Sequence, residues 1–335
     1  MEQKKRIFGY DALKALAAFF VVLYHVGIVD LGYREGVYYY PTLVQMLWLF
    51  CACGVPLFYM VNGALTVSRN YDWPKTRVKF YRLLRAALFW GVVSMIVYAV
   101  CKQTTSSFTV RRLFYYWFLY SLAIIYVINY LLGRLPRWCR LVVVIALLVV
   151  PFTTNLIWDV IILLHPQVEV PMWYHIGVFT MYGLVYLYLG DHLGHRRYSK
   201  WIALLSGVMG LALLALEATA VVNYEHTQFE GGNYCFPTLG ALLLSASLFI
   251  FIRDCDVKLT WLKRFITFLG NNALGIYIIH LLLMLILNAG FILLDVSLGI
   301  DHPIEVILLA VFYVVLSAGL SELLKRTFLA PLLKL

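Results

Sequence analysis

Residues 8–29, FGYDALKALAAFFVVLYHVGIV, form an apolar stretch long enough to cross a membrane. About 20 residues at 1.5 Å per residue cross the ~30 Å hydrocarbon layer of a bilayer. A chain in hydrocarbon must pair its backbone N–H and C=O groups within each segment, so such stretches are predicted to be helices. The sequence therefore predicts an all-α transmembrane bundle of about ten helices, near 8–29, 42–68, 83–101, 113–132, 141–164, 171–190, 201–222, 235–252, 266–294 and 303–324.

The composition supports a membrane protein. Of the 335 residues, 63% are hydrophobic and only 13% are charged, whereas about a quarter of the residues of a soluble domain are charged. The 24 Tyr, 21 Phe and 9 Trp suit a protein with two membrane interfaces. No connection is long enough for a separate soluble domain, so residues 1–335 are predicted to form a single domain.

The distribution of Lys and Arg predicts the orientation of the bundle. Only four of the 27 basic residues fall in the loops assigned to the outside, and Lys14 lies within the first helix. Cytoplasmic loops carry the excess of Lys and Arg, which places both termini in the cytoplasm of a bacterial inner membrane. This pattern explains the net charge of +10 without a nucleic-acid partner. About 22 basic residues lie in or beside the predicted cytoplasmic segments 1–7, 69–82, 133–140, 191–200, 253–265 and 325–335.

Three ionisable residues interrupt the first apolar stretch. Asp11 and Lys14 are three residues apart and can form an ion pair on one face of a helix. Lys14 and His25 are eleven residues apart, which places them on the same face with a separation of about 16 Å. An ionisable group inside a membrane is costly and is a functional candidate by default. The helix is therefore predicted to be retained and functional rather than to be a removable signal peptide.

Other polar residues are predicted to lie at the same two depths. Asn62 is about 9 Å from the cytoplasmic end of its stretch, as is Lys14. His280 and Glu217 reach roughly the depth of His25, which predicts an inner and an outer polar level. A buried His or Glu also serves as a hydrogen-bond partner between helices, and the sequence supports this structural interpretation of His280 and Glu217 equally well.

The segment 69–85, RNYDWPKTRVKFYRLLR, is strongly basic. The positive-inside rule alone accounts for charges at this position. Arg69, Arg82 and Arg85 are also suited to binding an anionic ligand at the cytoplasmic mouth of the bundle. The sequence supports the topological role and the ligand-binding role equally well.

These residues resemble the acyltransferase-3 family of membrane acyltransferases, in particular its short O-acetyltransferase members. The first helix resembles the family pattern of a basic residue, ten residues and a histidine, here Lys14 and His25. Asn62 and Ala273 stand where the family often has Ser. Four further stretches resemble family motifs in order and spacing: LFYMVNG at 57–63, YRLLR at 81–85, WFL at 117–119 and FLGNNALGIYIIH at 268–280.

The resemblance implies a reaction and a donor site. The family transfers an acyl group, usually acetyl from cytoplasmic acetyl-CoA, to a hydroxyl of an extracytoplasmic or lipid-linked glycan. CoA is a long anionic donor, and its phosphates suit Lys14 together with the donor-binding residues Asn62, Arg69, Arg82 and Arg85. No metal is implied.

The resemblance also implies catalytic roles for the polar residues of the first helix. A hydroxyl is a poor nucleophile at neutral pH, and the imidazole of His25 suits a general base, with Lys14 and Asp11 beside it on the helix. Alternatively, His25 accepts the acetyl group covalently and passes it on. His280 and Glu217 are then expected on the acceptor side.

A transporter is the alternative from a different class of protein. Intramembrane His, Lys, Asp and Glu also form substrate pathways and proton relays. Transporters commonly contain inverted repeats and paired broken helices, and the sequence shows neither. A purely structural anchor is disfavoured by the cost of Lys14 and His25 within the membrane.

The predicted topology can be tested with reporter fusions. Fusions after Arg85, Arg140, Lys200 and Arg264 are expected to report the cytoplasm, because these positions lie in or beside the basic segments. Fusions within the five predicted outer loops, at Asp30, Thr105, Val168, Gly231 and Asp301, are expected to report the outside. Two or more reversed positions would contradict the arrangement of ten helices.

Overall fold

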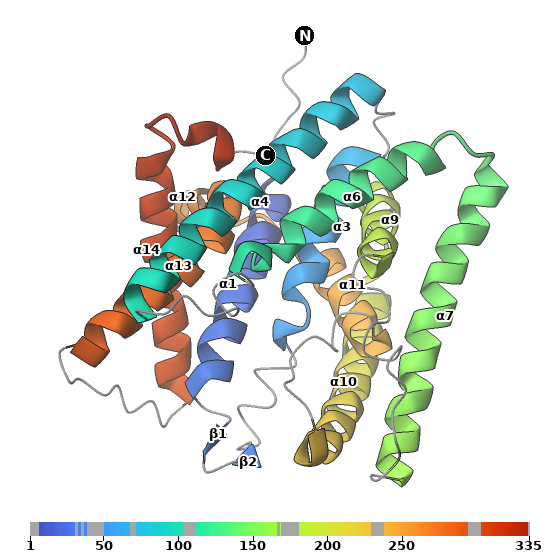
Figure 1. Cartoon of the computed structure of the whole chain (residues 1–335). Helices are drawn as coiled ribbons and strands as arrows, with labels where there is room; N and C mark the ends of the chain where they lie inside the picture. The colour runs from blue at the N-terminus through green and yellow to red at the C-terminus, as the bar shows by residue number, and fades with distance from the viewer. Residues whose placement is uncertain are drawn as a thin grey trace.

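The computed structural model describes residues 7–30, 33–34, 37–38, 50–67, 72–102, 112–165, 168, 181–228, 238–293 and 303–333. These residues form a helical bundle, as predicted, with a small antiparallel hairpin after the first helix (Figure 1). The elements are α1 (Phe8–Asp30), β1 (Tyr33–Arg34), β2 (Val37–Tyr38), α3 (Gly54–Thr66), α4 (Trp73–Lys102), η2 (Arg112–Phe114), α6 (Trp117–Leu132), α7 (Arg137–Leu164), α9 (Met181–His195), α10 (Lys200–Gln228), α11 (Leu239–Arg253), α12 (Thr260–Asn271), α13 (Ala273–Leu293), α14 (Pro303–Leu324) and η3 (Ala330–Leu332).

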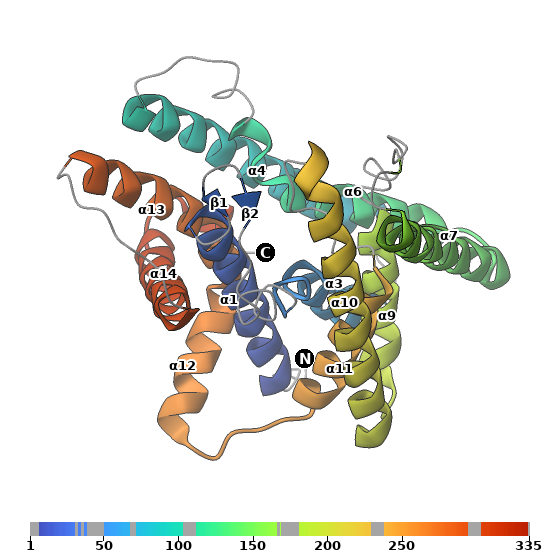
Figure 2. The ribbon, with the colours of Figure 1, turned by 90° about the horizontal axis from the view of Figure 1, so that it is seen from below.

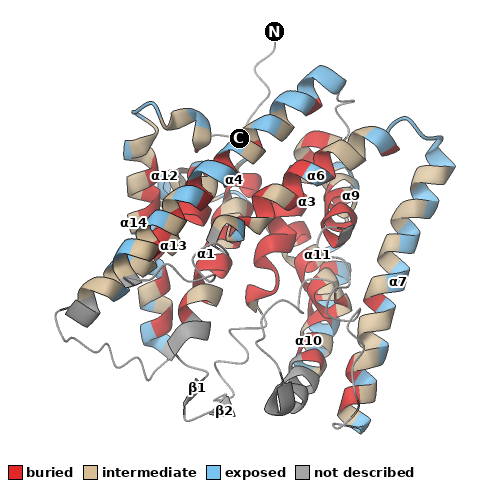
Figure 3. Cartoon of the chain, viewed as in Figure 1, coloured by how far each residue is buried: buried red, intermediate tan, exposed pale blue. Residues whose placement is uncertain are grey.

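Helix α1 lies at the centre of the bundle. It contacts α12, α13 and α14 on one side and α3 and α11 on the other (Figure 2). Figure 3 shows that buried residues concentrate on α1, α3 and α9, whereas most of α7 and the outer faces of α4 and α14 are not buried. Most of the first apolar stretch is therefore enclosed by protein, with Asp11 buried and with Lys14 and His25 partly exposed.

The lengths and compositions of the helices agree with a membrane bundle. Within the described residues, six helices are long and apolar enough to cross a bilayer, namely α1, α4, α7, α10, α13 and α14. Helices α6 and α11 are shorter apolar helices. Parts of four predicted spans lie outside the described residues, namely 42–49, 68, 171–180, 235–237 and 294.

One predicted span is broken. The prediction of a continuous helix over 266–294 is wrong, because α12 ends at Asn271 and α13 begins at Ala273. The side-chain Nδ2 of Asn272 donates to the carbonyl oxygen of Phe268 at 3.0 Å, a local bond that competes with helical pairing. Lys325 Nζ donates to Asn271 O at 2.9 Å and to Asn272 Oδ1 at 2.7 Å, which compensates the polar groups at the break.

Helix α4 begins about ten residues before the predicted start at residue 83. The helix therefore includes most of the basic segment that the sequence assigned to a loop. Lys75, Arg77 and Arg85 occur on this first part of α4, where long basic side chains can cover apolar surface and keep their charges in a polar environment.

Helices α3 and α9 pack with their backbones nearly in contact. A Cβ atom on Gly190 of α9 would lie 2.0 Å from Met60 O, and a Cβ on Gly63 of α3 would overlap the carbonyl oxygen of Leu187. Gly190 and Gly194 are four residues apart, the small-xxx-small spacing that allows helices in membranes to approach closely. Only glycine fits at this contact, because any Cβ atom would overlap the backbone of the facing helix.

A buried arginine joins the ends of α9 and α11. Arg253 is 5% exposed, and its guanidinium donates to the carbonyl oxygens of Leu193 and Arg196 near the end of α9. Asp254 forms an ion pair with it at 2.5 Å, and this hydrogen-bonded guanidinium lowers the pKa of the Asp254 carboxyl. The last carbonyls of a helix have no partner within the helix, so Arg253 compensates groups that would otherwise be costly to bury.

Replacing Gly190 with Ala is expected to destabilise the bundle. The new methyl group collides with the backbone of α3, and such overpacking typically costs about 1–3 kcal/mol. Thermal unfolding of the purified protein in detergent measures the effect. Gly319→Ala in α14 is the matched control, because a Cβ there meets nothing within 4 Å and alanine favours a helix. Equal melting temperatures for the two variants would contradict the close contact of α3 and α9.

Candidate active site

Two histidines from opposite ends of the chain meet inside the bundle. His25 is carried by α1 and His280 by α13, and their ring centroids lie 5.2 Å apart with an angle of 40° between the rings. The side chain of His280 is fully buried, whereas His25 is partly exposed. The sequence predicted a similar depth for the two residues, and the packing of α1 against α13 brings them into contact.

The hydrogen bonding of His280 selects one form of its ring. Its Nδ1 lies 2.8 Å from Ile276 O, one turn earlier in α13. A carbonyl oxygen only accepts, so we assign the hydrogen of the neutral ring to Nδ1. The other nitrogen, Nε2, is buried and has no hydrogen-bond partner among the described residues. A lone pair is thereby available to accept a hydrogen bond next to His25.

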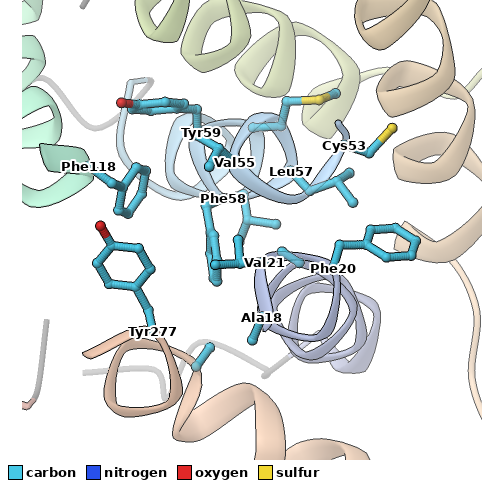
Figure 4. Close-up of a cluster of buried hydrophobic side chains, with 14 of the residues drawn as sticks. Ala18, Phe20, Val21, Cys53, Val55, Leu57, Phe58, Tyr59, Phe118 and Tyr277 are labelled. Carbon is cyan, nitrogen blue, oxygen red and sulfur yellow. The ribbon is translucent and has the colours of Figure 1, made fainter. Parts of the chain in front are cut away.

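Aromatic packing holds α13 in this position. Tyr277 precedes His280 by about one helical turn, and its ring centroid lies 5.4 Å from that of Phe118. Tyr116 donates from its hydroxyl to Ile278 O at 3.1 Å. Figure 4 shows Tyr277 of α13 pointing toward Phe118, with Phe58 of α3 beside them. The Trp-Phe-Leu stretch that begins α6 therefore contacts the helix that carries His280.

The inner polar level contains the predicted ion pair of α1. Lys14 Nζ lies 2.8 Å from Asp11 Oδ1, and Lys14 keeps 28% of its side chain exposed while Asp11 is buried. Pairing offsets part of the cost of a carboxylate among apolar helices. The lysine thus carries a cation at this level that is still accessible.

A chain of polar contacts runs outward from Asn62. Its Oδ1 accepts a hydrogen bond from Tyr126 OH at 2.9 Å, and its Nδ2 donates to Phe58 O at 2.8 Å. Lys79 Nζ lies 4.9 Å from the centroid of the Tyr126 ring, a cation–π distance. The sequence did not single out Tyr126 or Lys79. Both sides of the Asn62 amide are engaged, and its direct partner on another helix is Tyr126 of α6.

The predicted donor arginines are located on α4. Arg82 is half-buried, and Arg85 is exposed with its Nε donating to Tyr81 O at 3.3 Å. Neither guanidinium forms an ion pair with a described residue, so their charges are available to an anion. Arg69 lies outside the described residues.

Glu217 lies in a different cluster from the two histidines. Its Oε1 accepts from the backbone N–H of Gly240 at 3.3 Å, at the start of α11. Thr238 caps the same helix, with its hydroxyl accepting from Ala241 N at 3.2 Å. The first N–H groups of a helix have no partner within the helix, so an accepting oxygen such as Glu217 Oε1 compensates one of them. The structure thus gives Glu217 a structural contact, and its acceptor-side role stays a prediction.

Comparison with known families identifies the class of protein. The model of the acyltransferase-3 acyltransferase domain matches residues 7–325. The chain therefore belongs to the acyltransferase-3 family and is a membrane acyltransferase. Neither the curated proteins nor the solved structures contain a match to the chain.

Proposed function

We propose that this acyltransferase moves an acetyl group from cytoplasmic acetyl-CoA to a hydroxyl of an extracytoplasmic or lipid-linked glycan, with His25 as the general base. The observation that carries this proposal is the contact of His25 with His280 inside the bundle. Acetyl transfer to a hydroxyl needs a group that removes the hydroxyl proton, and a neutral imidazole is suited to this at neutral pH.

The two histidines suggest different roles. The Nε2 of His280 is a buried acceptor without a partner among the described residues, and it can orient the hydroxyl of the acceptor. His25 is partly exposed and removes the proton as the hydroxyl oxygen attacks the thioester carbonyl. The carbon–sulfur bond then breaks, and the protonated imidazole returns its proton to the CoA thiolate. In the covalent alternative, His25 itself accepts the acetyl group first, and a burst of acetylated enzyme in a rapid quench distinguishes the two routes.

The donor is proposed to extend along α1 from the inner polar level. Lys14 and His25 are separated by eleven residues, or about 16 Å along the helix. In this arrangement the phosphates of CoA bind to Arg82, Arg85 and Lys14. The thin pantetheine arm then extends toward His25 and places the thioester there. Arg82 and Arg85 support this role because neither is neutralised by a described carboxylate.

Loss of the α4 arginines is expected to weaken use of the donor. Arg82→Ala and Arg85→Ala should each raise the KM for acetyl-CoA by roughly fivefold or more, because charge-assisted contacts to phosphate are lost. The KM of the unaltered protein should rise with salt, and less steeply in the variants. Thiol release from acetyl-CoA by protein in lipid measures this. Arg264→Ala, an exposed arginine on α12, is the control. An unchanged KM in both variants would assign these arginines to topology alone.

Substitution of His25 is expected to abolish transfer while donor binding survives. His25→Ala and His25→Gln should lower kcat by at least about 10²-fold, because general-base catalysis typically contributes about 10²–10⁴-fold. His280→Gln should mainly raise the KM for the hydroxyl acceptor, because the glutamine can still offer an accepting oxygen. The assay follows thiol release with a hydroxyl acceptor present.

The control for the histidine variants is His195→Gln, an exposed histidine at the end of α9. Full thiol release by His25→Gln would refute the catalytic role, since glutamine keeps the hydrogen bonding of histidine without its basicity. Uptake of a solute that depends on His25, with unchanged acetylation, would favour the transporter.

A further inference from the structure

A cavity outside the proposed active site lies between α7 and α9. Its volume is about 570 Å³, within the roughly 300–1,000 Å³ of typical ligand pockets. It is bounded by the first three turns of α7, residues 185–192 of α9, Leu242 of α11 and Val67, which directly follows α3. The lining residues are Val67, Arg137, Arg140, Leu141, Val144, Leu148, Val185, Tyr188, Leu189, Asp191, His192 and Leu242.

The lining is divided into a polar end and an apolar wall. Arg137 and Arg140 stand at the start of α7, and Asp191 and His192 stand near the end of α9, so these groups share one end of the cavity. Leu141, Val144 and Leu148 continue along α7 at helical spacing, and Val185 and Leu189 face them from α9. From Arg137 to Leu148 the cavity follows α7 for about 16 Å.

The charge of the polar end suits a single phosphate. Two arginines and one aspartate leave a net charge of +1 when His192 is neutral. His192 contacts Tyr198 OH through Nε2 at 2.6 Å. His195 Nδ1 lies 3.4 Å from Asp191 Oδ1. Arginine binds phosphate oxygens through paired N–H groups, and a phosphodiester carries one negative charge.

The position of α7 leaves the cavity beside the bilayer. The buried residues of α7 are Phe152, Asp159 and Ile162, all beyond its first three turns. Figure 3 shows α7 at the edge of the bundle with little buried surface at its start. An apolar space between two membrane helices next to lipid is therefore accessible to an acyl chain.

We propose that this cavity binds an anionic phospholipid, with its phosphate on Arg137 and Arg140 and one acyl chain along Leu141, Val144 and Leu148. Basic pockets between transmembrane helices are known sites for lipid headgroups. The site is independent of the acetyl-transfer chemistry and holds a lipid of the leaflet at the end where α7 begins.

Native mass spectrometry of the purified full chain, titrated with dioleoyl phosphatidylglycerol, tests the site. The unaltered protein is expected to retain one tightly bound lipid. Arg137→Ala/Arg140→Ala should weaken this binding about tenfold or more by removing the phosphate contacts. Val144→Trp should weaken it similarly by filling the space of the acyl chain while leaving the charges in place.

Matched controls separate the site from general effects. Lys200→Ala/Arg264→Ala removes two exposed charges outside the cavity, and Val142→Trp adds the same bulk on α7 at a residue that is 57% exposed and does not line the cavity. Both controls should bind like the unaltered protein. Equal lipid binding by the cavity variants and the controls would overturn the proposal. Arg137 and Arg140 would then serve only the membrane topology. Displacement of the lipid by glycerol 3-phosphate at the same concentration also overturns it, because the site then binds a free phosphate without a chain.

Discussion

The enclosure of α1 by other helices is the constraint on which the rest of the structure depends. Helices α3, α11, α12, α13 and α14 all contact it, so each polar residue on α1 must find its partner in protein. Lys14 meets Asp11 on the same helix, and His25 meets His280 on another. In a bilayer no water is available to replace such partners. The central helix therefore carries three ionisable groups, Asp11, Lys14 and His25, inside the bundle.

The break between α12 and α13 has a consequence for His280. If residues 266–294 continued as one straight helix, the direction of α13 would be set by α12. Instead Asn272 ends the first segment, and Lys325 near the end of α14 binds the polar groups at the break. The direction of α13 therefore depends on its contacts with Tyr116 and Phe118 rather than on α12. These contacts position His280 beside His25. A local sequence feature and a distant lysine thus act together on the site.

The polar groups of the bundle fall into three separate environments with different physical roles. The paired histidines have an available lone pair and partial exposure, which are properties of a reactive site. Glu217 and Arg253 compensate helix ends and are interpreted as structural. Arg137 and Arg140 line the polar end of the cavity between α7 and α9. Burial alone does not distinguish these roles, but the identity of the partner does.

The sequence by itself determined which segments are apolar and approximately where most helices lie, because hydropathy and the helical period are local properties of the chain. It also placed Asp11, Lys14 and His25 on one helix and predicted the ion pair of the first two, since residues three apart on a helix are neighbours. Only the tertiary structure decided that His280 contacts His25 while Glu217 of α10, at a similar predicted depth, instead contacts the start of α11. Equal depth does not specify which helices are adjacent, because adjacency depends on the packing of side chains far apart in the chain. The contacts of Tyr126, Lys79 and Lys325 could not be predicted from the sequence for the same reason, because their partners are on other helices.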